Sequence, residues 1–140
     1  MSKLLVPFDN SSTALRALEH AIAYARSHEG TTLHVLTVLD DVSPETRELI
    51  DAVEIERVLT AEAKRQQQAA RARLEPTGLS CVYQAIAGAP ARVIADYARD
   101  HSIDHIVMGT RGLGKIAGLL LGSVATKVVH EVRCPVTLVK

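Results

Sequence analysis

Five glycines follow a short apolar run in the last third of the chain, and their spacing is the strongest chemical signal in the sequence. Ile106 to Met108 reads as a buried strand, and glycine then recurs at positions 109, 112, 114, 118 and 122. Glycine backbone takes positive φ and lets a ligand approach main-chain N–H groups closely. Ser123 follows at the expected start of a helix, where unpaired N–H donors and a capping hydroxyl meet. Strand, glycine loop and helix start together predict an anion site, for which phosphate is the most common ligand.

Two familiar phosphate motifs match these glycines only in part. A P-loop requires Ser or Thr after its lysine, but Ile116 follows Lys115. Gly112, Gly114 and Ala117 fit the dinucleotide fingerprint. That fingerprint should open the first strand–helix unit and be followed about 20 residues later by an acidic residue that ends the next strand. Here the next expected strand is the last one, so both motifs are disfavoured.

Composition and charge describe an ordinary globular chain. Hydrophobic residues make up 47% of the 140 residues, and this length predicts one domain, residues 1–140. Lys and Arg (16) balance Asp and Glu (16), so no net field favours nucleic acid or an anionic membrane as a partner. We find neither a membrane-spanning run nor a secretion signal. Cys81 and Cys134 lie far apart in expected strands, so we expect two buried, reduced thiols and a cytoplasmic location.

Apolar periodicity alternates between strand and helix along the whole chain. Helices are expected from a cap near Ser11 to Gly30, from Glu45 to about Arg73, from Pro90 onward and over residues 123–132. Strands are expected at residues 4–8, 32–39, 79–87, 103–108 and 135–139. This order predicts an α/β fold, a doubly wound five-stranded parallel sheet with helices on both faces.

Within these elements, some side chains are expected to face inward. The second helix should bury a stripe, and His34 and His130 should be partly buried and structural. His101 and His105 are four residues apart, but they flank a helix-to-strand junction and should not share a face. The expected inward residues are Leu49, Val53 and Leu59 or Ala63 in the second helix, and Val93, Ile94, Tyr97 and Ala98 in the third.

A longer spacing accounts for the glycine loop better than either phosphate motif. Gly109, Gly112 and the pair Gly122 and Ser123 form the pattern G-x2-G-x9-G-S. This pattern resembles that of the universal stress proteins that bind ATP. Residues 3–11, 88–91 and 134–139 are similar to that family's first strand, the start of its third helix and its last strand. The resemblance therefore spans essentially the whole chain.

The resemblance implies a fold order, a ligand and a partner. The implied strand order is 3-2-1-4-5, the ligand is ATP, and the partner is a second copy paired through Val136–Val139. In this order the first and fourth strands are neighbours at the switch point of the sheet, where ligands bind beyond the carboxyl ends of the strands. Asp9 and Gly109 should therefore converge on one crevice.

The resemblance also implies roles for individual residues. Asp9 would contact the adenosine, although capping the helix together with Asn10 and Ser11 is an alternative. The main chain of Val38 would contact adenine, and a simple core role is equally compatible. The expected nucleotide site comprises Pro7, Asp9, Val38, Met108, Gly109, Arg111, Gly112, Gly122, Ser123 and Val124.

The glycines of this set would hold the phosphates. Gly109 and Gly112 would shape the phosphate turn, while Gly122 and Ser123 would present N–H groups and a hydroxyl. Arg111 and Lys115 would add positive charge, unless they are simply solvated. Ala125 stands where some ATP-binding relatives carry a hydroxyl residue, which removes one expected phosphate contact.

Three functions stay open at this stage. The first is a signalling module for the stress response that binds ATP, with or without Mg²⁺ or Mn²⁺. The second is a weak metal-dependent ATPase, and the third is a dimerisation protein whose nucleotide site is vestigial. The sequence shows no nucleophile–base motif and no HExxH or Cys/His cluster, and Asp9 and Asp40 are the only carboxylates near the loop. We therefore expect no catalytic residues and at most slow hydrolysis.

Overall fold

The centre of the protein is a parallel β-sheet of five strands. The computed structural model describes residues 1–111 and 120–140. The strands are β1 (Lys3–Pro7), β2 (Thr32–Leu39), β3 (Ser80–Ala87), β4 (His105–Gly109) and β5 (Val136–Val139). Their order is β3-β2-β1-β4-β5, and every neighbouring pair is parallel. The doubly wound α/β fold and the strand order 3-2-1-4-5 are confirmed.

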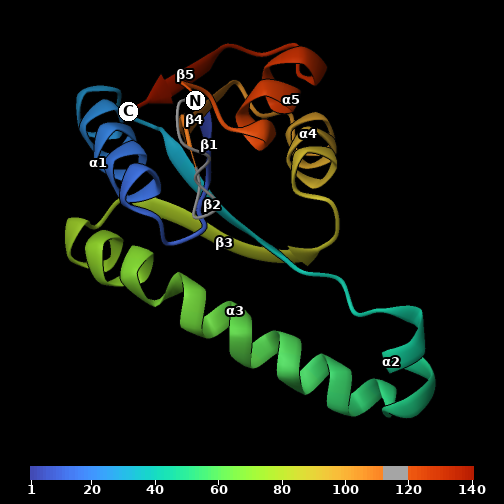
Figure 1. Ribbon diagram of the computed structural model, residues 1–140. Coiled ribbons are helices and arrows are strands. Elements are labelled where there is room, and N and C mark those ends of the chain that lie inside the picture. The colour runs from blue at the N-terminus through green and yellow to red at the C-terminus, as the bar shows by residue number, and fades with distance from the viewer. Residues whose placement is uncertain (112–119) are drawn as a thin grey trace.

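Helices cover both faces of this sheet (Figure 1). On one face lie α1 (Ser12–Ser27) and α3 (Ala52–Leu74), and on the other lie α4 (Pro90–Asp100) and α5 (Ser123–Glu131). Successive strand residues point to opposite faces. Leu4 therefore joins the core beneath α1 and α3, while Leu5 joins the core beneath α4 and α5. Each face thus has its own hydrophobic core.

The first helix begins at the expected cap but ends before the expected glycine. The hydroxyl of Ser11 accepts a hydrogen bond from the amide of Ala14 at 3.2 Å. The helix stops at Ser27 with His28 as its C-cap, so the expected end at Gly30 is wrong by a few residues. Gly30 instead takes φ of 82° in the turn that leads to β2.

The single long helix expected from Glu45 to Arg73 is wrong, because the structure has two helices there. The first, α2 (Pro44–Leu49), is followed by Ile50 in an extended conformation. The carboxylate of Asp51 then accepts from the amide of Val53 at 3.0 Å and caps α3. A short 3-10 turn, η1 (Glu75–Thr77), ends this region. An Asp cap restarts a helix in the middle of what reads as continuous periodicity.

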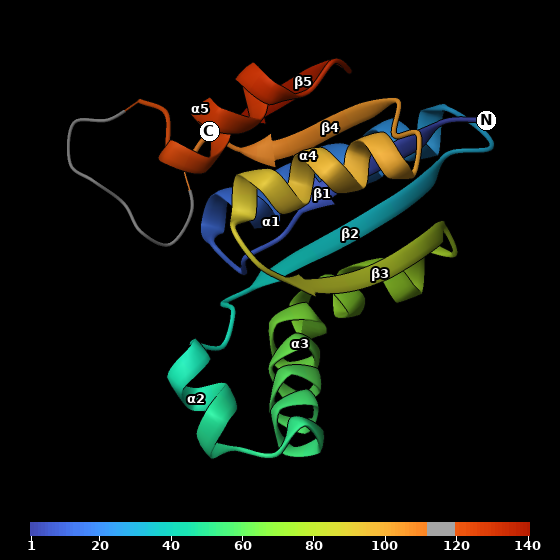
Figure 2. The ribbon, with the colours of Figure 1, turned by 90° about the vertical axis from the view of Figure 1, so that its right-hand side faces the viewer.

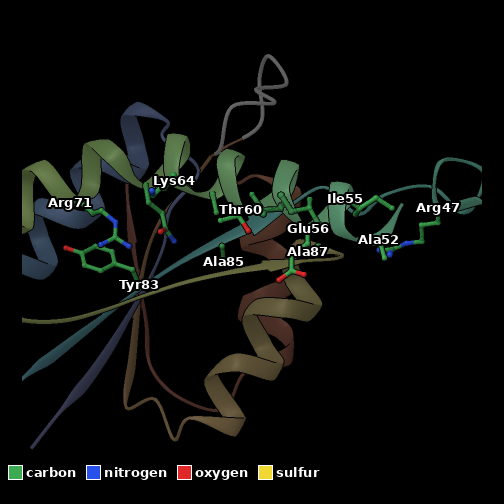
Figure 3. A pocket seen from close by; sticks show the side chains of 14 residues that line it. Arg47, Ala52, Ile55, Glu56, Thr60, Lys64, Arg71, Tyr83, Ala85 and Ala87 are labelled. Carbon is green, nitrogen blue, oxygen red and sulfur yellow. The ribbon is translucent and has the colours of Figure 1, made fainter. Parts of the chain in front are cut away.

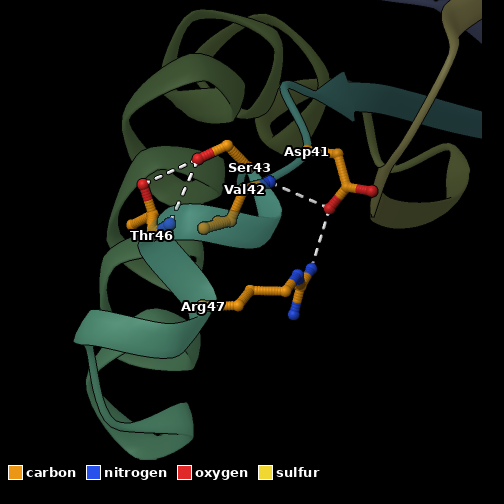
Figure 4. Close-up of polar contacts among 5 residues, drawn as sticks. All are labelled: Asp41, Val42, Ser43, Thr46 and Arg47. Atoms are coloured by element: carbon orange, nitrogen blue, oxygen red, sulfur yellow. Dashed lines mark hydrogen bonds and ion pairs between the residues drawn. The ribbon is translucent and has the colours of Figure 1, made fainter.

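Local polar contacts hold α2 at its start (Figure 4). The hydroxyl of Ser43 accepts from the amide of Thr46 at 3.2 Å, as an N-cap does. The carboxylate of Asp41 accepts from the amide of Val42 at 2.9 Å and from the guanidinium of Arg47 at 2.8 Å. The Arg47 guanidinium lowers the pKa of the Asp41 carboxyl below its usual value.

The buried stripe of α3 also differs from the expected one. Leu49 and Val53 are 85% and 74% exposed, so their expected burial is wrong. The buried residues of α3 are Ile55, Gln67, Ala70 and Leu74. Three of these four lie in the C-terminal half, so that half holds the helix on the sheet.

Gln67 ties α3 to the outer strand β3. Its side chain is 4% exposed, and its Nε2 donates to the carbonyl of Gln84 at 2.8 Å. In the described part of the chain, β3 pairs only with β2. The bond does not cover the free edge of β3. The amide of Gly88 donates to the carbonyl of Leu39, so the alternate residue Gln84 also directs its main chain toward β2, and Gln67 reaches that carbonyl from the helix above.

A buried polar pair lies on the other face, between β2 and α4. His34 Nδ1 is 2.8 Å from the Tyr97 hydroxyl, and the Tyr97 ring stacks on His101 with centroids 3.8 Å apart. Burial lowers the pKa of His34, and the charges of His101 and Lys3 lower it further. The structural role expected for His34 fits this environment. The partial burial expected for His130 is wrong, because that residue is exposed.

The two cysteines are less buried than expected. Cys81 lies in β3, whereas Cys134 precedes β5, and both are half-buried free thiols. Burial raises the pKa of each thiol. Among the helices that the structure describes, none has the length and apolar character needed to cross a membrane.

Candidate functional site

The switch point of the sheet lies between β1 and β4. The two strands pair with Leu5 opposite Ile106, and their carboxyl ends face the same way, as the strand arrows of Figure 2 show. From this edge the chain continues from β1 into α1 on one face, while α5, which follows β4, packs on the other face. A crevice between diverging connections of this kind is where doubly wound sheets bind ligands.

Gly109 ends β4 and packs directly against the start of α1. A Cβ atom on Gly109 would lie 2.5 Å from Oγ1 and 2.8 Å from Cβ of Thr13. No larger residue fits there without displacing backbone. The φ angle is positive at Gly30, Gly78 and Gly88 but not at Gly109, so this glycine serves close approach and not a left-handed turn.

Thr13 is a site residue that the sequence analysis missed. Its side chain is buried, its hydroxyl donates to the carbonyl of Arg111, and it lies 3.3 Å from the hydroxyl of Ser11. This contact joins the residues after β4 to the first turn of α1. The sequence offered only a weak signal, because a hydroxyl residue in a first helical turn usually has a local role.

The two ends of the glycine-rich segment are held together. The amide of Gly122 donates to the carbonyl of Thr110 at 2.6 Å, and the amide of Thr110 donates to the carbonyl of Val139 at 2.9 Å. The segment therefore leaves and re-enters the fold at one point. Gly112 lies outside the described residues, as do Gly114, Lys115 and Gly118.

The start of α5 differs in detail from the expected one. Gly122 is the N-cap, and Ser123 is the first helical residue, so the expected capping by the Ser123 hydroxyl is wrong. Ser123 is exposed at the helix start, where main-chain N–H groups lack helical acceptors. Thr126 closes the turn, since its hydroxyl donates to the carbonyl of Gly122 at 2.9 Å. Ala125 is buried and belongs to the core beneath α5.

Asp9 shapes the turn between β1 and α1. Its Oδ1 accepts from the amide of Ser11 at 3.0 Å, and Asn10 between them takes φ of 66°. Asparagine tolerates this left-handed conformation better than most residues. Of the capping residues raised as an alternative, Ser11 is the helix cap, whereas Asp9 forms the turn before it. The nucleotide role of Asp9 stays a prediction.

The remaining expected residues gather mainly on one face of the sheet. Met108 is buried in the core beneath α4 and α5, and Val38 and Val124 pack against that core. Pro7 is the last residue of β1, while Arg111 is exposed. Val38 lies one residue before the end of β2. The described residues contain no cluster of three or more His, Cys, Asp or Glu side chains suited to a metal ion.

This site and this fold define a class of protein. The chain belongs to the universal stress protein family, which matches it over residues 1–140. A relative from Thermus aquaticus, named universal stress protein in QAH/OAS sulfhydrylase 3′ region, is 36% identical over 141 residues, covering 98% of this chain and 97% of its own.

Solved structures agree with this assignment. Protein MJ0577, a universal stress protein of Methanocaldococcus jannaschii, superposes with a TM-score of 0.87 at 32% identity, covering 99% of this chain and 95% of that one. A universal stress protein in complex with cAMP superposes with a TM-score of 0.73 at 26% identity, covering 99% and 97%.

Proposed function

We propose that this protein binds an adenine nucleotide, ATP, at the switch point and acts in the cytoplasm as a nucleotide-dependent regulatory module of the stress response. The observation that carries this proposal is the packing of Gly109 on Thr13 together with the Gly122–Thr110 hydrogen bond. These contacts bring the end of β4 and the starts of α1 and α5 together at the switch point. Two helix starts then supply main-chain N–H donors to an anion.

The proposed nucleotide lies with its adenosine and phosphates in different parts of the crevice. Asp9, Pro7, Val38 and Met108 contact the adenosine. Gly109, Gly112, Gly122, Ser123, Val124 and Arg111 surround the phosphates. The solved relative in complex with cAMP supports a ligand of this chemical class.

Calorimetry on the purified chain tests the proposal. ATP binding is expected, and Gly122→Val should weaken it at least tenfold, because a branched side chain would crowd the N-cap that faces the phosphates. Gly78→Ala is the matched control, since that glycine lies after η1 and a Cβ there would meet nothing within 4 Å. Failure to bind ATP, ADP or AMP, or equal affinity in the Gly122→Val protein, would show the proposal to be wrong.

Hydrolysis is proposed to be slow at best. Phosphoryl transfer needs metal ions and a group that positions the attacking water. The proposed site offers Asp9, whose carboxylate already accepts from the Ser11 amide. Rapid release of ADP with Mg²⁺ or Mn²⁺ that disappears in Asp9→Asn would instead make the protein an ATPase.

A homodimer through β5 is the second part of the proposal. Among the described strands, β5 pairs only with β4, and its four residues Val136–Val139 are half-buried and mostly apolar. Apolar edge strands readily pair with another chain. Sedimentation equilibrium is expected to give a dimer, and a monomer at all concentrations would refute this pairing.

A further inference from the structure

A groove of about 510 Å³ lies between α3 and the sheet, at the carboxyl ends of β2 and β3 (Figure 3). Leu39 and Tyr83 line it, and Tyr83 packs against the core beneath α1 and α3. Val38 and Met108 belong to the core on the opposite face of the sheet. None of the residues that line the groove belongs to the proposed nucleotide site, so the two sites are separate.

Small side chains create this groove. The floor contains Ala85 and Ala87 of β3, and the roof is the stripe of Ile55, Leu59 and Ala63, which recurs every fourth residue on α3. Residues four apart lie on one face of a helix. Gln67, Ala70 and Leu74 are buried in the C-terminal half of α3, and the short side chains of the two alanines leave space beneath the roof stripe. An apolar channel remains along the roof stripe, about 12 Å long by helix rise.

One end of the groove carries positive charge. The Arg71 guanidinium lies over the Tyr83 ring, 4.0 Å from its centroid, and Lys64 lines the groove nearby (Figure 3). Neither cation forms a salt bridge with a carboxylate in the described part of the chain, whereas Arg47 at the far end is paired with Asp41. The acidic side chain in the lining is that of Glu56. An anion is thus favoured at the end formed by Arg71 and Lys64.

We propose that this groove binds a small amphipathic carboxylate of the medium-chain fatty acid type. Its alkyl chain lies over Ala85 and Ala87 beneath the roof stripe of α3, and its carboxylate accepts hydrogen bonds from Arg71 and Lys64. The planar guanidinium is suited to bidentate contact with a carboxylate, and its contact with the Tyr83 ring restricts where it lies. A groove of this volume is in the usual size range of small-molecule sites.

Titration with sodium decanoate below its micelle concentration, followed by amide and methyl NMR shifts, tests this proposal. Saturable shifts are expected at Ala85 and Ala87. Arg71→Gln should weaken binding about tenfold, because it removes a charge-assisted contact. Ala85→Leu should abolish binding by filling the channel, and Ala63→Leu fills the same channel from the helix side. Arg57→Gln is the matched control, since Arg57 lies on the same helix, is exposed, and pairs with Glu54 outside the groove.

Several outcomes would overturn the proposal. If decanol bound as tightly as decanoate, Arg71 and Lys64 would not contribute to binding through their charge. Unchanged decanoate affinity in folded Ala85→Leu and Ala63→Leu proteins would place the ligand elsewhere, as would shifts confined to the crevice between β1 and β4. Saturating ATP should leave decanoate affinity unchanged, and Gly122→Val should bind decanoate normally, so this proposal and the nucleotide proposal can fail independently.

Discussion

At the end of β4, Gly109 brings α1 into direct contact with the strand, whereas at the end of β3, Ala85 and Ala87 leave a groove beneath α3. The first region is closed by hydrogen bonds that tie Thr13 to Arg111 and Gly122 to Thr110. In the second region, Gln67, Ala70 and Leu74 hold α3 over the sheet, and the two alanines do not fill the space beneath it. A small residue therefore produces close contact where hydrogen bonds hold the strand and the helix together, as at Gly109. It leaves empty space where other residues fix the position of the helix, as at Ala85 and Ala87.

Among the substitutions that test this contrast, Gly109→Ala should have the largest effect on the free energy of unfolding. The added Cβ would overlap Thr13, where side chain and backbone lie within 3.0 Å of it, so we expect a loss of about 3 kcal/mol in the free energy of unfolding. Urea denaturation measures this loss. Gly78→Ala is the control, because a Cβ at Gly78 meets open space. We expect this variant to lose only about 1 kcal/mol in the free energy of unfolding, since alanine disfavours the left-handed backbone there. If Gly109→Ala lowers the free energy of unfolding less than Gly78→Ala does, the contact between Gly109 and Thr13 does not require a glycine.

Replacement by valine at two buried threonines, Thr37 and Thr13, should change the free energy of unfolding in opposite directions. Thr37 is fully buried opposite Ala85, and its hydroxyl has no hydrogen-bond partner among the described residues, so Thr37→Val should raise the free energy of unfolding by about 1 kcal/mol. Thr13→Val should lower it by about 1 kcal/mol, because the bond to Arg111 is lost. Paired urea denaturation curves decide between these signs. Destabilisation by Thr37→Val would mean that its hydroxyl has a partner, such as water reaching it from the groove.

Ala85→Leu should have the smallest effect on the free energy of unfolding. Its added carbons enter existing space, so we expect a free energy of unfolding that is unchanged or raised by less than about 1 kcal/mol. Thermal unfolding followed by circular dichroism measures it. A loss comparable to that of Gly109→Ala would show that α3 is packed against β3 as tightly as α1 is packed against β4.

The alternating pattern of strands and helices could be predicted because each element carries its own periodicity. The break at Ile50 and Asp51 could not, because apolar residues continue through it and α2 buries none of its side chains. Gly109 was found by its place in a spacing pattern, but its physical reason, contact with Thr13, joins residues almost 100 positions apart. Such a contact has no local signature. The groove is equally invisible in the sequence, since alanine is common in strands and in helices and only their juxtaposition leaves space.

The position of β5 at one edge of the described sheet also bears on how large an assembly can become. A sheet with two unprotected edges can add chains at both sides and grow into a fibre. If copies pair through β5 as proposed, the contact is self-complementary, and two-fold symmetry ends the growth at two chains. The symmetry of one edge contact would then separate a finite particle from a polymer.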